Sequence, residues 1–160
     1  HRDLHSFPTR RSSDLALSDV AKASYQGNLY LAFPQTVESS ITCKVTVPAQ
    51  DVPAGAQMQL EFWLLSTVAA TLPDLSLSYR KQADPGDGKA ALVLADTALA
   101  DIGPTVAQAS TLAWQYVCVV SEAFDVSPGD VVYFTLTRTT ADGYAGDVGL
   151  LQTRWTIVGS

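Results

Sequence analysis

Histidine is almost absent from this chain of 160 residues: His1 and His5 stand at its start, and residues 16–160 contain none. Histidine is the usual general base near neutral pH and the commonest metal ligand in proteins. Its absence excludes Ser-His-Asp catalysis, Cys-His catalysis and histidine-based zinc sites within residues 16–160.

Glutamate is also scarce. The chain contains Glu38, Glu61 and Glu122, and none of them pairs in sequence with a second acid on the same strand face. Hydrolysis of a glycosidic bond needs two carboxylates at a working separation across a cleft. We therefore predict that the chain is not an enzyme and that it has no catalytic residues, no cofactor and no metal site.

Positive charge and long apolar runs are missing as well. The chain has 10 Lys and Arg residues against 16 Asp and Glu residues, which gives a formal net charge of −6 at pH 7. Such a surface repels phosphate backbones, so we predict no nucleic-acid partner. No apolar run approaches the roughly 20 residues of a membrane-spanning helix, so we expect no membrane insertion.

Cysteine occurs twice, as Cys43 and Cys118, and we expect both on the inward face of strands. Buried thiols that pack as small hydrophobic side chains are the favoured interpretation. A disulfide between the two stays open, because the sequence does not place their Cα atoms at bridging distance.

The first fifteen residues, HRDLHSFPTRRSSDL, are similar to the translation of one reading frame of a common short-read sequencing adapter. We interpret residues 1–15 as adapter-derived and exclude them from reasoning about the fold. Without their three arginines and two aspartates, residues 16–160 carry 7 basic and 14 acidic side chains, a formal charge of −7. We expect residues 16–160 to form a single domain, and the chain's own N-terminus to lie upstream of the fragment.

Apolar and polar residues alternate with a period of two from Asn28 onward, which predicts half-buried strands. Strands are expected at 39–47, 57–66, 75–80, 111–121 and 131–138, and around Leu151, Trp155 and Ile157. The stretch 89–108 is ambiguous, although Leu92, Val93 and Leu94 favour a strand. About eight strands without crossover helices predict an all-β fold, a two-sheet antiparallel β-sandwich of the jelly-roll type.

The C-terminal third has a recurrent turn-and-strand pattern. Pro128-Gly129-Asp130 precedes an apolar strand that ends at Arg138, and the turn Asp142-Gly143 and the pair Gly146-Asp147 follow. This pattern resembles small jelly-roll domains of tailed-phage structural proteins, of the tail-fibre, baseplate or head-decoration type. The resemblance implies a non-enzymatic virion module that assembles with other virion proteins and forms a homo-oligomer, with a trimer favoured.

Large side chains on outward strand faces are the candidates for a subunit interface. Trp63, Leu65 and Tyr133 occupy such positions, and aromatic rings dominate protein interfaces as well as cores. The alternative function is that of a carbohydrate-binding module that binds a surface glycan, or of a secreted adhesin domain. In that case exposed rings are the stacking surfaces, and Tyr144, at the tip of a Gly-rich turn, is the best candidate for a ligand contact.

Arg138 falls at the core phase of its strand, at the strand end, with Asp142 and Asp147 a few residues later. We predict that these three residues form a structural ion pair that ties the hairpin together. A partly buried pair of this kind is costly to break from one side.

Overall fold

Strands form wherever the alternation of apolar and polar side chains is regular, because each such segment buries one face and leaves the other to solvent. The computed structural model describes residues 2–5, 15–105, 108 and 112–159. In these residues it has no α-helix and two antiparallel sheets. The strands are β1 (Arg2–His5), β2 (Leu15–Ser18), β3 (Ala21–Tyr25), β4 (Asn28–Phe33), β5 (Ser39–Thr46), β6 (Gln57–Ser66), β7 (Leu75–Gln82), β8 (Thr97–Ile102), β9 (Gln115–Val120), β10 (Phe124–Asp125), β11 (Val131–Arg138) and β12 (Val148–Val158).

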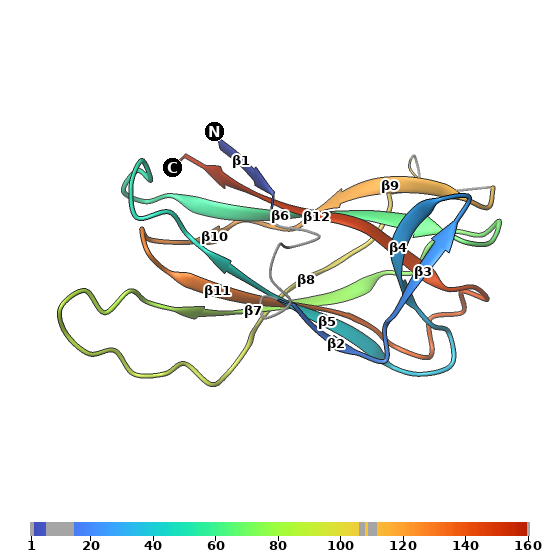
Figure 1. Cartoon of the computed structure of the whole chain (residues 1–160), viewed down its shortest axis with the longest axis horizontal. Coiled ribbons are helices and arrows are strands. Elements are labelled where there is room, and N and C mark those ends of the chain that lie inside the picture. Colours follow the sequence, from blue (N-terminus) through green and yellow to red (C-terminus); the bar gives the residue numbers. More distant parts are fainter. Residues whose placement is uncertain (1, 6–14, 106–107, 109–111, 160) are drawn as a thin grey trace.

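The two sheets lie face to face as the layers of a sandwich (Figure 1). One sheet has seven strands in the order β10-β6-β12-β4-β3, with β9 also paired to β6 and β1 also paired to β12. The other has five strands in the order β2-β5-β11-β7-β8. This architecture confirms the predicted β-sandwich of jelly-roll type.

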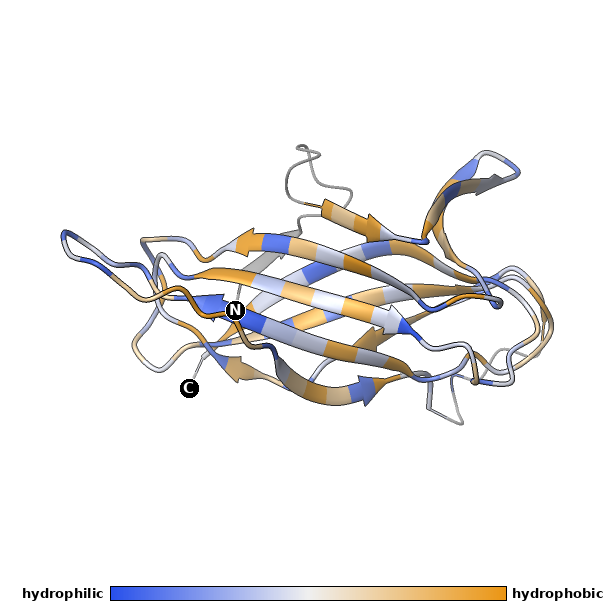
Figure 2. Cartoon of the chain, turned by 90° about the horizontal axis from the view of Figure 1, so that it is seen from below, coloured by the Kyte–Doolittle hydropathy of each residue, from blue (hydrophilic) through white to orange (hydrophobic). Residues whose placement is uncertain are grey.

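The core fills the space between the inner faces. Phe62 of the seven-stranded sheet meets Phe134 of the five-stranded sheet edge to face, with ring centroids 5.7 Å apart. Tyr79 and Phe124 also meet across the layers, as a stacked pair at 4.1 Å. Burial of each large apolar side chain contributes about 1.5–3 kcal/mol, so the two layers are held together mainly by such contacts. Figure 2, in which the five-stranded sheet is in front, shows that hydrophilic and hydrophobic residues alternate along its strands.

The strand count is larger than the sequence predicts. Among the described residues twelve strands are present instead of about eight, because β1, β2, β3 and β10 are short strands that extend or cover sheet edges. The expected strand at Leu92–Leu94 does not form, and this exposed stretch belongs to the loop between β7 and β8. The Gln82 amide holds Val93 there, through bonds of 2.7 and 2.8 Å to its backbone carbonyl and N–H. None of the described segments is a helix long and apolar enough to cross a membrane.

Candidate functional site

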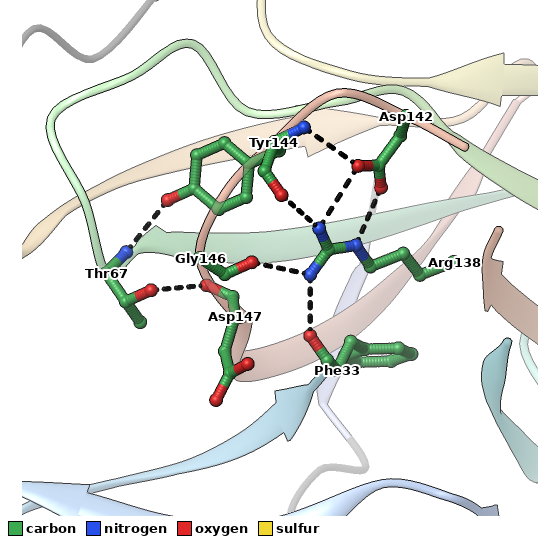
Figure 3. Close-up of polar contacts among 7 residues, drawn as sticks. All are labelled: Phe33, Thr67, Arg138, Asp142, Tyr144, Gly146 and Asp147. Atoms are coloured by element: carbon green, nitrogen blue, oxygen red, sulfur yellow. Dashed lines mark hydrogen bonds and ion pairs between the residues drawn. The ribbon is translucent and has the colours of Figure 1, made fainter. Parts of the chain in front are cut away.

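Arg138 lies at the end of β11 and is fully buried, at the centre of a polar cluster (Figure 3). It donates two hydrogen bonds to the Asp142 carboxylate, at 2.6 and 3.1 Å. Its remaining N–H groups donate to the carbonyls of Phe33 and Gly146 and to that of Tyr144, at 2.7–2.8 Å. A guanidinium has five N–H donors, and all five are used. Arg138 therefore stabilises the fold and presents no donor to a ligand.

Asp142 supplies the compensating charge for this buried cation. The hydrogen bond from Arg138 holds the pKa of the Asp142 carboxyl below its ordinary value. Asp147, which the sequence predicts in the same ion pair, lies on the other side of the turn, where its carbonyl accepts from the Thr67 hydroxyl at 2.6 Å. The structural pair thus consists of Arg138 and Asp142, and Asp147 is not among the partners of the guanidinium.

Tyr144 is not available for a ligand, contrary to the prediction. Only 2% of it is exposed, and its ring lies 5.5 Å from the Arg138 guanidinium. Its hydroxyl accepts from the backbone N–H groups of Thr67 and Val68, at 3.0 and 3.2 Å. The turn that carries Tyr144 folds inward because the two residues that follow β6 provide these donors.

The three predicted interface residues do not form one surface. Trp63 lies on the outer face of the seven-stranded sheet, whereas Tyr133, whose ring lies 5.8 Å from the Arg80 guanidinium, lies on the outer face of the five-stranded sheet. Leu65 shares the face of Trp63 but is only 6% exposed. A single interface cannot use all three residues, because the whole sandwich separates Tyr133 from the others.

The two cysteines lie in different sheets and are unbridged. Cys43 is buried in the core, and burial raises the pKa of its thiol to about 12. Cys118 is directly opposite Trp63 in the β6–β9 pair, so it faces outward and not inward as predicted. Partial burial raises the pKa of the Cys118 thiol as well.

The β3–β4 hairpin crosses the outer face of the seven-stranded sheet. β4 pairs with β12 on one side of the central β6–β12 pair, and β9 pairs with β6 on the other. Even so, the Tyr25 ring of the hairpin stacks on Trp114, just before β9, with centroids 3.6 Å apart and an interplanar angle of 1°. The hairpin therefore extends from β12, with which β4 pairs, over β6 to the residue before β9. Figure 1 shows its tip beside the beginning of β9.

A glycine makes this crossing possible. At Gly149 a Cβ atom would lie 2.8 Å from the Leu65 Cβ and 3.1 Å from the Tyr30 Cδ2, closer than side chains pack. The missing side chain lets Leu65 and Tyr30 occupy the space above β12. This packing explains why Leu65 is buried although it points away from the sandwich core.

Five aromatic side chains gather around this crossing, and we call them the aromatic face: Tyr25, Tyr30, Trp63, Trp114 and Tyr116. Tyr30 meets Trp114 edge to face at 6.3 Å, and Trp63 lies nearly parallel to Tyr116 at 5.9 Å. Tyr116 is 63% exposed, Tyr25 37% and Trp114 36%. The face is thus rigidly packed underneath and accessible above.

Trp114 adopts a strained backbone, with φ of 63°, which is rare for a bulky side chain. Ser66, the last residue of β6, holds it in place. The Trp114 N–H donates to the Ser66 carbonyl at 2.7 Å, and the Ser66 hydroxyl reaches the carbonyls of Leu112 and Gln115 at 3.2 and 3.0 Å. Strain of this kind costs about 1–3 kcal/mol and persists where the surrounding structure enforces it, often at binding sites.

A polar pair borders the aromatic face. Glu61 and Arg154 are directly opposite each other on β6 and β12, and the Arg154 Nε donates to Glu61 Oε2 at 2.7 Å. Glu61 is two residues from Trp63 on the same face of β6. Rings with adjacent hydrogen-bonding groups are what a small-molecule site requires. Among the described residues, no three His, Cys, Asp or Glu side chains come together as a metal site.

Of the aromatic face, the sequence-based candidates include only Trp63. Tyr116 and Trp114 share the strand phase of Cys118, which the sequence pattern places inward. Both faces of 115–120 carry apolar residues, and the period of two alone does not say which face is buried. Tyr25 and Tyr30 belong to a hairpin whose contact with Trp114 has no sequence signal, because the partners are far apart in the chain. The strain at Trp114 is likewise invisible in the sequence.

The fold is similar to that of solved carbohydrate-binding modules, whereas no known protein family and no curated protein matches the sequence. The C-terminal CBM6 of LamC, a marine laminarinase from Zobellia galactanivorans, matches with a TM-score of 0.53 and 15% identity, over 97% of this chain and 98% of that chain. TmCBM61, solved with β-1,4-galactotriose, has a TM-score of 0.46 and 17% identity over 98% and 99% of the two chains. The CBM35 of Cellvibrio japonicus Abf62 has a TM-score of 0.47 and 10% identity over 93% and 90%. At 15% identity the likeness to the LamC module is one of fold alone.

Proposed function

We propose that this chain is a carbohydrate-binding domain and that the aromatic face is its binding site. The observation that carries the proposal is the arrangement of five aromatic rings on one outer face, packed against one another yet partly exposed. Rings on a monomer surface that are pre-positioned in this way mark a binding site. Loss of conformational freedom on binding is small, because stacking and the Ser66 contacts already hold the rings.

The chemistry of the site suits a sugar. The C–H face of a pyranose packs on a flat aromatic ring, and its hydroxyl groups need donors and acceptors beside that ring. Tyr116, the most exposed member of the face, provides a ring surface, and the Glu61–Arg154 pair supplies both kinds of polar group. The fold shared with the LamC module adds support by analogy, since fold alone does not establish function.

We propose binding without catalysis at this site. Glu61 is the one acidic residue in the described strands β6, β9 and β12, and its carboxylate is bonded to Arg154. Glycoside hydrolysis uses two carboxylates on either side of the scissile bond. These three strands do not provide a second one.

Affinity electrophoresis in gels that contain soluble polysaccharides tests the proposal, with tryptophan fluorescence as a second readout because Trp63 and Trp114 belong to the site. The wild-type chain should be retarded by at least one polysaccharide. Tyr116→Ala should abolish the retardation and leave stability nearly unchanged, because its ring is mostly exposed. Tyr133→Ala is the matched control on the opposite sheet and should bind like wild type. Equal loss in both variants, or no binding by the wild type to any polysaccharide, would contradict the proposal.

Self-association in a virion, which the phage resemblance implies, is a separate proposal with its own test. Light scattering over a concentration series gives the solution mass, and a trimer would favour a virion component. Because Trp63 and Tyr133 lie on opposite sheets, substitution of each separately shows which face such an oligomer would use.

A further inference from the structure

A β-bulge interrupts the β6–β12 pair within the aromatic face. Before the bulge, Leu150 is opposite Leu64. The next pair joins Gln152 to Trp63, so Leu151 is the extra residue on β12. In a regular ladder Leu151 would stand opposite Trp63 and share its outward face. The bulge therefore puts a glutamine beside Trp63 where regular pairing would put a leucine. Bulges are frequent next to functional sites, where they re-aim a side chain.

Gln152 belongs to the outer face of the seven-stranded sheet. Directly opposite residues of an antiparallel pair project to the same side, with Cβ atoms about 4.5–5.5 Å apart, and Trp63 faces outward. Two residues further along β12, Arg154 is opposite Glu61 on that same side. The partly exposed Gln152 side chain thus starts between a ring of the aromatic face and the polar pair at its border. A sugar packed against Trp63 has its edge within reach of this side chain.

The fold does not use the amide of Gln152. The other long polar side chains on the outer face of β6 and β12 have hydrogen-bond partners within the protein: Gln57 with Asp125, Gln59 with the Ser121 carbonyl, and Glu61 with Arg154. Among the residues that the structure describes, none forms a hydrogen bond with the Gln152 amide. A side-chain amide offers both a donor and an acceptor. A ligand can use both here without displacing a protein partner.

Resting on the proposed function, we propose that Gln152 determines the specificity of the site by recognising two adjacent hydroxyl groups of a sugar packed against Trp63. One hydroxyl donates to Gln152 Oε1, and its neighbour accepts from Nε2. The linkage of the polysaccharide decides whether such a pair exists. Within a chain, a 1,4-linked pyranose keeps its adjacent 2- and 3-hydroxyls, whereas a 1,3-linked pyranose keeps the 2- and 4-hydroxyls, which are not adjacent. The site should therefore prefer 1,4-linked chains to 1,3-linked chains of the same sugar.

Calorimetric titration of the whole chain with β-linked hexasaccharides of xylose, glucose and galactose, each in a 1,4-linked and a 1,3-linked form, tests this assignment. Both end residues are methylated at the linkage positions, so every residue presents only the hydroxyls of an internal one. Wild type should bind the 1,4-linked form of at least one sugar at least about fivefold more tightly than the 1,3-linked form, the effect of two hydrogen bonds. Gln152→Met keeps a similar length without hydrogen-bonding groups. It should bind both forms weakly and equally, through the rings.

Gln59→Met is the matched control. Gln59 is a partly exposed glutamine on the same outer face, four residues from Trp63, and its amide already has a partner in the Ser121 carbonyl. This variant should keep the wild-type affinity and the preference for 1,4-linked chains. Gln152→Met should leave the denaturant midpoint nearly unchanged, because the fold loses no hydrogen bond.

The outcomes separate this proposal from the proposed function. If wild type binds no polysaccharide in the affinity gels, the proposed function fails and the role of Gln152 fails with it. If wild type binds a polysaccharide but none of the hexasaccharides, or binds both linkages equally, glycan binding stands and the recognition of adjacent hydroxyls is overturned. A folded Gln152→Met chain that keeps the preference, or equal losses in Gln152→Met and Gln59→Met, would overturn it as well. The wild-type comparison alone can overturn the proposal, so the test survives a variant that does not fold.

Discussion

Replacement of Arg138 with Met should lower the free energy of unfolding by several kcal/mol. The guanidinium is fully buried and uses all five donors, two on Asp142 and three on backbone carbonyls. Methionine fills a similar volume but donates nothing. The substitution leaves Asp142 as a partly buried charge without its partner, and it removes the donor from three backbone carbonyls, those of Phe33, Tyr144 and Gly146.

The expected loss is about 3–5 kcal/mol, the cost of breaking a buried ion pair from one side. The free energy of unfolding of a domain is about 5–15 kcal/mol, so this loss is a large fraction of the total. The loss should appear as a lower denaturant midpoint at an unchanged slope in urea or guanidinium unfolding. A changed slope would instead indicate an altered unfolded or native state.

Arg154→Met is the matched control. The Arg154 side chain is 31% exposed, and surface ion pairs contribute about 0–1 kcal/mol. Two arginines, each bonded to a carboxylate, should therefore differ severalfold in the cost of the same substitution. A loss below about 1 kcal/mol for Arg138→Met, or equal losses at both positions, would refute a stabilising role that depends on burial.

Three further outcomes are expected. Tyr144→Phe should lower stability by about 1–3 kcal/mol in denaturant unfolding, because two backbone N–H groups lose their acceptor, and it should leave glycan binding unchanged; lost binding with intact stability would restore Tyr144 as a ligand contact. Because the folded pKa of Asp142 lies below its ordinary 3.8, its stabilising effect is fully present above that value and is lost as the pH falls through the lowered pKa. The stability gap between wild type and Asp142→Asn should thus be constant near neutral pH and should shrink in acid, and a constant gap down to about pH 2 would contradict the pairing with Arg138. In iodoacetamide labelling followed by mass spectrometry, the native chain should modify Cys118 slowly and Cys43 only after unfolding, since burial raises both thiol pKa values and that of Cys43 to about 12; rapid labelling of Cys43 in the native state would contradict its burial.

The fold class follows from the sequence because strand periodicity is a local property. Strand β5 alternates cleanly between apolar and polar residues and buries its apolar side, and β6 and β11 likewise bury every second residue along most of their length. Arg138 and Asp142 are four residues apart, so their pairing is also a local inference. Patterns that reside within a few neighbouring residues suffice for such conclusions.

The site depends on contacts between segments that are distant in the chain. The period of β9 separates Tyr116 and Cys118 from Val117 and Val119, but only the pairing with β6 decides which of these sets faces the core. Trp63 and Tyr133 likewise lie in different sheets. The alternation of apolar and polar residues does not predict this, because it does not say which strands pair with each other.

The sequence by itself determined a two-layer β-sandwich with a buried charged hairpin. Only the tertiary structure decided that Tyr144 turns inward to donors just after β6. It likewise decided that the β3–β4 hairpin reaches across the seven-stranded sheet to place Tyr25 on Trp114. The physical reason is that periodicity reports the burial of one face of a segment. The partner that covers or flanks that segment is set by long-range packing, such as the space that Gly149 leaves for Tyr30 and Leu65.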